Sequence, residues 1–213
     1  MLDKKAENNM NLRELIKSDI CRFRQTFSLR SESYAYRRVF WESIFFKSGF
    51  RAVLLYRLSH WLYTKGHTYA AWWLTRRNVK STGAEIEFNA CIGPGLLITH
   101  PVGIVVGRGT VIGANATIFQ GVSFGVKSWH PNSIRKFPRV GRNCFFFTGS
   151  VILGDIEIGD YCVIGANAVV NNNMPNGSLA LGIPAEIFAD KGREQIFAWQ
   201  GGNDLSAQVS LKG

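Results

Sequence analysis

Residues 140–170 read VGRNCFFFTGSVILGDIEIGDYCVIGANAVV, and a large apolar residue recurs at every sixth position of this stretch. The recurring residues are Val140, Phe146, Ile152, Ile158, Ile164 and Val170. A period of six fits neither the repeat of about 3.6 residues of an α-helix nor a simple hairpin meander. It is typical of a parallel β-helix, in which each face of a triangular coil contributes one such residue.

The same period extends toward the N-terminus. Two earlier runs are Val106, Ile112, Ile118 and Phe124, and Ile86, Ile92, Ile98 and Ile104. The inward position between the large residues is small or aliphatic, at Ala90, Thr110, Ala116, Val122, Cys144, Ser150, Cys162 and Ala168. Asn115, Asn143 and Asn167 stand where we expect the chain to turn through positive φ. The pattern predicts a narrow coil from about Glu85 to about Val170.

Two interruptions break the repeat. The register slips by two residues between Ile104 and Val106, and residues 125–139 leave the repeat as a projecting loop. Insertions in solenoid proteins project from one face and often form the binding surface. We therefore expect function near these two places.

The organisation predicted from the pattern has three parts. Residues 1–82 form an α-helical N-terminal region, residues 83–187 the β-helix, and residues 188–213 a C-terminal tail. Helices are expected over Asn11–Gln25, near Tyr36, over Phe50–Tyr63 and over Tyr69–Arg77. The chain has no run of eighteen apolar residues and its start lacks the apolar segment of a signal peptide, so we expect a cytoplasmic protein. The four cysteines are interpreted as reduced packing residues.

The net charge of +10 lies wholly in residues 1–80, which hold 16 Lys and Arg against 6 Asp and Glu. Such asymmetry indicates either an anionic partner or a solvated helical face. No nucleic-acid-binding motif accompanies the charge. The dense aromatic residues of the helices favour packing against another subunit, and a peripheral contact with an anionic membrane is the alternative.

His100 is the one histidine inside the predicted coil, directly before the register slip. Histidine suits proton transfer near neutral pH. Glu85 lies fifteen residues earlier, on what we expect to be the neighbouring rung, where a carboxylate would hold the neutral tautomer of the imidazole. A zinc site on such a coil needs about three converging histidines, which the coil does not offer, so no metal is expected.

Several segments of the chain resemble the serine acetyltransferase group of left-handed β-helix (hexapeptide-repeat) acyltransferases. They are residues 85–106, FQGVSFG, the coil from Val140 to Val170, LGIPAE and the helix SGFRAVLLYRLSHWL. The resemblance implies a left-handed coil and direct acetyl transfer from acetyl-CoA, without a permanently bound cofactor. His100 matches the general base and Glu85 its carboxylate partner. We expect backbone N–H groups at the coil surface to stabilise the oxyanion.

The resemblance also assigns binding residues. Thr99, Lys136 and Phe137 stand where the family carries charged groups that hold serine, and His130 lies in the same loop. Gly125, Thr148, Gly149 and Ala166 match positions along which the cofactor lies, and Arg139 is placed to reach a phosphate. Because the charged serine-binding groups are replaced, we expect a sugar hydroxyl of cell-surface polysaccharide biosynthesis as the acceptor.

Two other functions stay open from the sequence. The first is serine O-acetylation for cysteine biosynthesis, and the second is a non-catalytic β-solenoid scaffold. The expected assembly is a homotrimer, with a dimer of trimers as a further alternative and no nucleic-acid partner.

Overall fold

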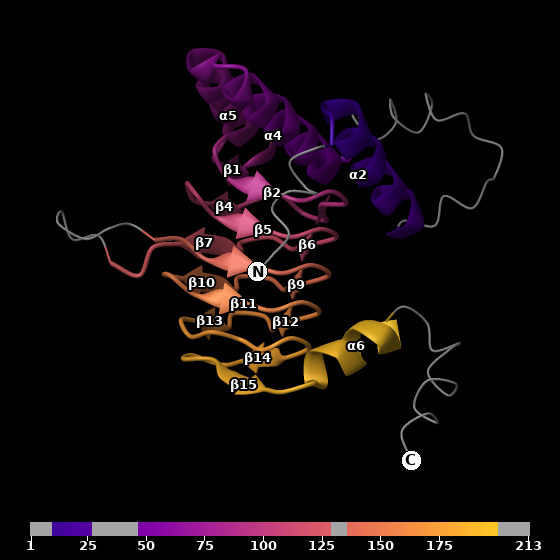
Figure 1. Ribbon diagram of the computed structural model, residues 1–213, viewed down its shortest axis with the longest axis vertical. Coiled ribbons are helices and arrows are strands. Elements are labelled where there is room, and N and C mark those ends of the chain that lie inside the picture. Colours follow the sequence, from indigo (N-terminus) through magenta and orange to yellow (C-terminus); the bar gives the residue numbers. More distant parts are fainter. Residues whose placement is uncertain (1–9, 27–46, 129–135, 200–213) are drawn as a thin grey trace.

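The computed structural model describes residues 10–26, 47–128 and 136–199. Helices stand at one end of a stack of parallel coils, and one further helix lies beside the other end (Figure 1). The predicted helical zone near Tyr36 and the loop residue His130 lie outside the described residues.

Three parallel sheets form the walls of the coil. Sheet A has the strand order β1-β4-β7-β10-β13, sheet B the order β11-β8-β5-β2, and sheet C the order β15-β14-β12-β9-β6-β3. Among the strands of the described residues, β15 alone pairs antiparallel, against β14. The strands are β1 (Glu85–Ile86), β2 (Cys91–Ile92), β3 (Leu97–Ile98), β4 (Val105–Val106), β5 (Val111–Ile112), β6 (Thr117–Ile118), β7 (Ser123–Gly125), β8 (Arg139–Val140), β9 (Phe145–Phe146), β10 (Val151–Leu153), β11 (Glu157–Ile158), β12 (Val163–Ile164), β13 (Val169–Val170), β14 (Leu179–Leu181) and β15 (Glu186–Phe188).

The register confirms the period of six, with one refinement. Phe124, Ile152 and Val170 are paired in one inward column, as the repeat requires. In the first coil, however, Ile86 is paired with Val106. Ile104 is fully buried but lies outside any strand, so the slip falls in residues 99–104. The predicted small positions are buried, and Asn115, Asn143 and Asn167 have φ of 59°, 56° and 56°.

The helices are α2 (Leu12–Thr26), α4 (Ser48–Thr64), α5 (Thr68–Thr82) and α6 (Lys191–Trp199). A reciprocal capping box begins α2, because Asn11 and Glu14 each donate a backbone N–H to the other's side chain at 3.0 Å. Gly49 lets α4 approach the coil, since a Cβ there would lie 1.9 Å from the Ile98 carbonyl oxygen. Among the helices of the described residues, none is long and apolar enough to cross a bilayer. The cytoplasmic location stays a prediction.

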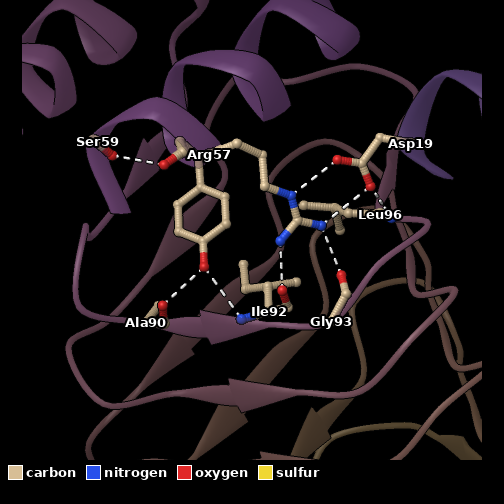
Figure 2. A network of polar contacts seen from close by, with 8 residues as sticks. Asp19, Arg57, Ser59, Ala90, Ile92, Gly93 and Leu96 are labelled. Atoms are coloured by element: carbon tan, nitrogen blue, oxygen red, sulfur yellow. Dashed lines mark hydrogen bonds and ion pairs between the residues drawn. The ribbon is translucent and has the colours of Figure 1, made fainter. Parts of the chain in front are cut away.

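A buried ion pair joins the helices to the first coil (Figure 2). The Arg57 guanidinium donates to Asp19 through Nε at 2.9 Å and through Nη2 at 3.1 Å. It also donates to the carbonyls of Ile92 and Gly93, and the N–H of Leu96 donates to Asp19 at 2.9 Å. Burial raises the pKa of the Asp19 carboxyl, against the opposing effects of Arg57 and Leu96. One network therefore connects α2, α4 and the turn that leads into β3.

Arg57→Met should lower the free energy of unfolding by about 3–5 kcal/mol, because it leaves the Asp19 carboxylate buried without its cation. Urea denaturation of the variant and the wild type measures this loss. Lys191→Met is the matched control, since its pair with Glu194 is exposed and contributes less than about 1 kcal/mol. Equal losses in both variants would contradict a structural role for the network.

His60 on α4 gives stability a dependence on pH. Its Nδ1 lies 2.7 Å from the Phe88 carbonyl oxygen, and an acceptor there requires Nδ1 to carry the proton. Burial lowers the pKa of His60 below its ordinary value of 6.5, so the unfolded chain binds the extra proton more readily. The neutral, buried His60 therefore contributes its full stability above pH 6.5, and this stability is lost as the pH falls below 6.5.

Melting temperatures at about pH 7.5 and about pH 5.5 test this effect. The wild type should lose more stability on acidification than His60→Asn, whose amide can donate to Phe88 without titrating. His67→Asn, at an exposed residue, should keep the wild-type difference. If His60→Asn loses as much melting temperature between the two pH values as the wild type, His60 is not the source of the pH dependence.

Candidate functional site

The slipped register creates an exposed bulge at one corner of the coil. We call the turns that connect sheet C to sheet A the CA corner, comprising residues 99–104, 119–122, 147–150 and 165–168. Thr99 donates its N–H to Ile118 O at 3.3 Å, and Gly121 donates to Val102 O at 3.0 Å. From the pair Ile98–Ile118 to the pair Val106–Phe124 the first coil has two more residues than the coil below, and His100 is exposed in this stretch.

Two buried polar atoms flank His100. The hydroxyl of Thr99 and the side-chain oxygen of Gln120 have no hydrogen-bond partner within the described part of the chain. The backbone bonds of Thr99 and Gly121 place Gln120 opposite His100 on the next coil. Gln120 was not predicted from the sequence, although its position in the repeat, two residues after Ile118, matches that of His100 after Ile98.

The next turns of the CA corner hold three of the residues expected to bind the cofactor. Gly149 donates its N–H to Gln120 O at 2.9 Å, and Asn167 donates to Thr148 O at 2.8 Å. Gly149 has a φ of 69°, and a Cβ there would lie 2.3 Å from Asn167 Oδ1. Ala166 is exposed beside Asn167. At Thr148, Gly149 and Ala166 the wall below His100 is therefore built of backbone and small side chains, which a ligand can approach closely, whereas the stacked rings of Phe119 and Phe147 lie at the start of the same turns.

Glu85 lies next to the CA corner on the outer side of sheet A. Its N–H donates to Ile104 O at 2.8 Å, and Gly103 donates to Gly83 O at 3.0 Å, so the chain around Glu85 runs alongside the bulge. The Glu85 carboxylate is 3.9 Å from Arg76 Nη1, with both side chains largely exposed. No hydrogen bond or ion pair between Glu85 and His100 occurs among the described residues.

The predicted residues of the projecting loop lie on the far side of sheet A from the CA corner, where sheet A leads into sheet B. Gly125 ends β7 and accepts a hydrogen bond from Gly154 N at 2.9 Å. Lys136 is paired with Asp155 at 2.6 Å. Phe137 lies over Gly107, where a Cβ would come within 2.4 Å of its Cε1. Arg139 is exposed on sheet B. One subunit thus brings Thr99, His100, Thr148, Gly149 and Ala166 to the CA corner. The four residues of the projecting loop and its ends, Gly125, Lys136, Phe137 and Arg139, lie away from that corner.

The described part of the chain does not gather metal-ligating side chains into a cluster at this corner. No cluster of three or more His, Cys, Asp and Glu side chains that could hold an ion occurs in residues 10–26, 47–128 and 136–199. The chemistry that the CA corner offers directly is proton transfer by His100 beside uncharged hydrogen-bonding groups.

Known proteins are similar to this chain over the repeat and over a larger part of its length. Residues 137–172 match the family model "Bacterial transferase hexapeptide (six repeats)". The serine acetyltransferase of Helicobacter pylori is 38% identical over 146 residues, which cover 68% of this chain and 84% of that protein. This chain belongs to the serine acetyltransferase family of hexapeptide-repeat acyltransferases.

Solved structures agree with this assignment. Soybean serine acetyltransferase complexed with serine has a TM-score of 0.72 at 28% identity, with 83% of this chain and 69% of that chain covered. Brucella abortus serine acetyltransferase with coenzyme A has a TM-score of 0.72 at 29% identity, with 87% and 71% covered. The fold is the predicted left-handed β-helix with N-terminal helices, and the protein is an O-acetyltransferase with acetyl-CoA as co-substrate.

The predicted sugar acceptor was wrong. The relatives are serine acetyltransferases, and the soybean structure contains serine. The prediction took Lys136 and Phe137 as members of the pocket around Thr99. In the structure Lys136 is ion-paired with Asp155 and Phe137 covers Gly107, at the opposite edge of sheet A. Lys136 and Phe137 therefore do not line the acceptor pocket around Thr99 of their own subunit, and the sugar acceptor cannot be inferred from them.

Proposed function

We propose that the protein transfers an acetyl group from acetyl-CoA to the hydroxyl of L-serine at the CA corner. The observation that carries this proposal is the exposed bulge, where His100 stands beside two buried polar atoms without partners, on Thr99 and Gln120. Buried polar atoms are usually paired, so these two are available to a bound acceptor. The serine-bound structure of the soybean relative supports the choice of acceptor.

His100 is the proposed general base. Its unprotonated ring nitrogen takes the proton of the serine hydroxyl while the oxygen attacks the thioester carbonyl carbon. Backbone N–H groups of the corner stabilise the resulting oxyanion. The C–S bond then breaks, and the leaving thiolate receives the proton from the imidazolium. The products are O-acetylserine and coenzyme A, with no covalent enzyme intermediate.

Glu85 is the proposed orienting partner of His100. Its present contact with Arg76 is long and exposed, and such pairs contribute little free energy. The carboxylate can therefore turn toward the neighbouring bulge when substrates bind. There it would fix the tautomer of His100 and stabilise the imidazolium.

Acetyl-CoA is proposed to lie along Thr148, Gly149 and Ala166, where the corner presents backbone and small side chains. Gly125, Arg139, His130, Lys136 and Phe137 were expected to join the same site. We propose that any of them that contact the ligands do so from a neighbouring subunit, because Gly125 and Lys136 lie across sheet A from His100.

His100→Ala should lower kcat for L-serine acetylation by about 10²- to 10⁴-fold, because general base catalysis contributes that much. Release of coenzyme A thiol from acetyl-CoA measures the rate. His67→Ala is the control, since His67 is exposed on the turn between α4 and α5. Glu85→Gln should lower kcat about 100-fold through misorientation, whereas Glu87→Gln should stay near wild type. Full activity of His100→Ala would contradict the mechanism.

A homotrimer is the proposed assembly, through the outer face of sheet A. The outward column of this sheet runs Glu85, Val105, Ser123, Val151 and Val169 in register. Helices α2, α4 and α6 contact strands of sheet C, and α5 contacts β1 at the end of sheet A. Further along sheet A, Val105 is 40% exposed, and neighbouring Val102 is 68% exposed. Apolar residues grouped on an outer face favour burial against another copy. Such a contact would enclose the CA corner.

Val105→Asp should dissociate the assembly and lower acetyl transfer, because it introduces an unpaired charge into the apolar face. Light scattering coupled to gel filtration gives the mass of the particle. Val111→Asp makes the same change at the outward position of sheet B and should leave the mass unaltered. A monomeric wild type, or an unchanged mass in Val105→Asp, would overturn the proposed interface. A dimer of trimers stays a prediction.

A further inference from the structure

An aromatic and cationic surface covers one face of α5. Tyr69 is 92% exposed, Trp72 50% and Trp73 60%. Arg76, Arg77 and Lys80 are also exposed. These six residues are spaced three or four apart, so they share one face of the helix. We call them the α5 surface.

The opposite face of α5 packs on the rest of the protein. Ala71, Thr75 and Asn78 are buried, and Asn78 donates to Ala52 O of α4 at 3.0 Å. Helix α5 also contacts β1. The aromatic side chains of the α5 surface are therefore not needed to attach the helix. The hairpin of α4 and α5 extends beyond the first coil at the end of the molecule (Figure 1).

The charge around this surface is mainly positive, although the Glu85 carboxylate lies 3.9 Å from Arg76 Nη1. From Ser48 to Ala84 the sequence holds six arginines and lysines and no aspartate or glutamate. Arg77 and Lys80 form no ion pair among the described residues. Arg76 lies 5.4 Å from the ring centroid of Trp72, which keeps aromatic and cationic groups in one layer.

We propose that the α5 surface binds the face of an anionic lipid bilayer. Tryptophan and tyrosine concentrate at membrane interfaces because their rings are apolar with a polar edge. Arginine and lysine beside them attract anionic headgroups. A contact with the headgroup layer of the bilayer does not require a helix that spans the membrane.

The charge argues against a second copy of the chain as the occupant. A two-fold interface would place the α5 surface against itself, and Arg77 and Lys80, which form no ion pair in the described part of the chain, would then face other cations. The exposed valine face of sheet A lies on the wall of the coil, and it adjoins the α5 surface where Glu85 contacts Arg76. The anionic bilayer satisfies both the aromatic and the cationic residues.

Flotation of the full chain with phosphatidylcholine vesicles, with and without roughly one-third phosphatidylglycerol, tests the proposal. We expect binding to the anionic vesicles only, weakened by salt. Arg77→Gln with Lys80→Gln should lower the partition coefficient about 30-fold. Arg13→Gln with Lys17→Gln removes the same charge from α2 and should change it less than about threefold.

Trp72→Ser with Trp73→Ser should lower binding at least about tenfold while circular dichroism stays unchanged, because both side chains are exposed. Phe188→Ser, at the far end of the coil, should bind like the wild type. Absence of wild-type binding, or binding unaffected by both α5 variants, would overturn the proposal. So would a change of particle mass in the tryptophan variant, which would assign the surface to another copy of the chain. Because the readout is vesicle binding, the result is independent of the acceptor.

Discussion

The structure depends on the stacking of inward side chains in three columns. Each short strand pairs with the strands one coil above and below, so its side chains must repeat in register along the stack. Ile98, Ile118, Phe146 and Ile164 form one such column and are fully buried. This constraint fixes where every corner falls. The two extra residues of the first coil cannot enter a column, so they bulge outward and expose His100.

The open end of the first coil has backbone groups that need hydrogen-bond partners. Parallel strands at the end of a stack leave backbone groups without partners, and such ends require a cap. Arg57 supplies donors to two carbonyls of this coil, and Asp19 accepts from the N–H of Leu96. Tyr56 adds to the cap by donating to Ala90 O at 2.8 Å and accepting from Ile92 N at 3.1 Å (Figure 2). The chain from Ile92 to Leu96 is thus held rigid just before Thr99 and His100.

Much of the coil could be predicted from the sequence because the repeat is local. The position of a residue in the hexad predicts its place in the coil. Ile112 and Cys144 are buried inward, and Asn167 turns the chain at positive φ, as their positions predict. The bulge at His100 was visible as a slip in the same period. The N-terminal region has no such rule, so the pairing of Asp19 with Arg57, which lie far apart in the sequence, could not be foreseen.

The candidate site was harder to predict for the same physical reason. Sequence spacing indicates which rung a residue occupies, but it does not show which corner a projecting loop returns to. Lys136 and Phe137 were therefore grouped with Thr99, although sheet A separates them. The carboxylate of Glu85 was assigned to His100, whereas its contact in the structure is Arg76, on a helix that the spacing argument did not include.

Hydrogen exchange of the wild-type protein, with and without coenzyme A and L-serine, tests most directly that the CA corner is the site of acetyl transfer. We predict that coenzyme A slows exchange of the amides in residues 147–150 and 165–168, and that L-serine slows exchange of the amides in residues 99–104 and 119–122. Slowed exchange confined to other segments, or no response to L-serine, would contradict it.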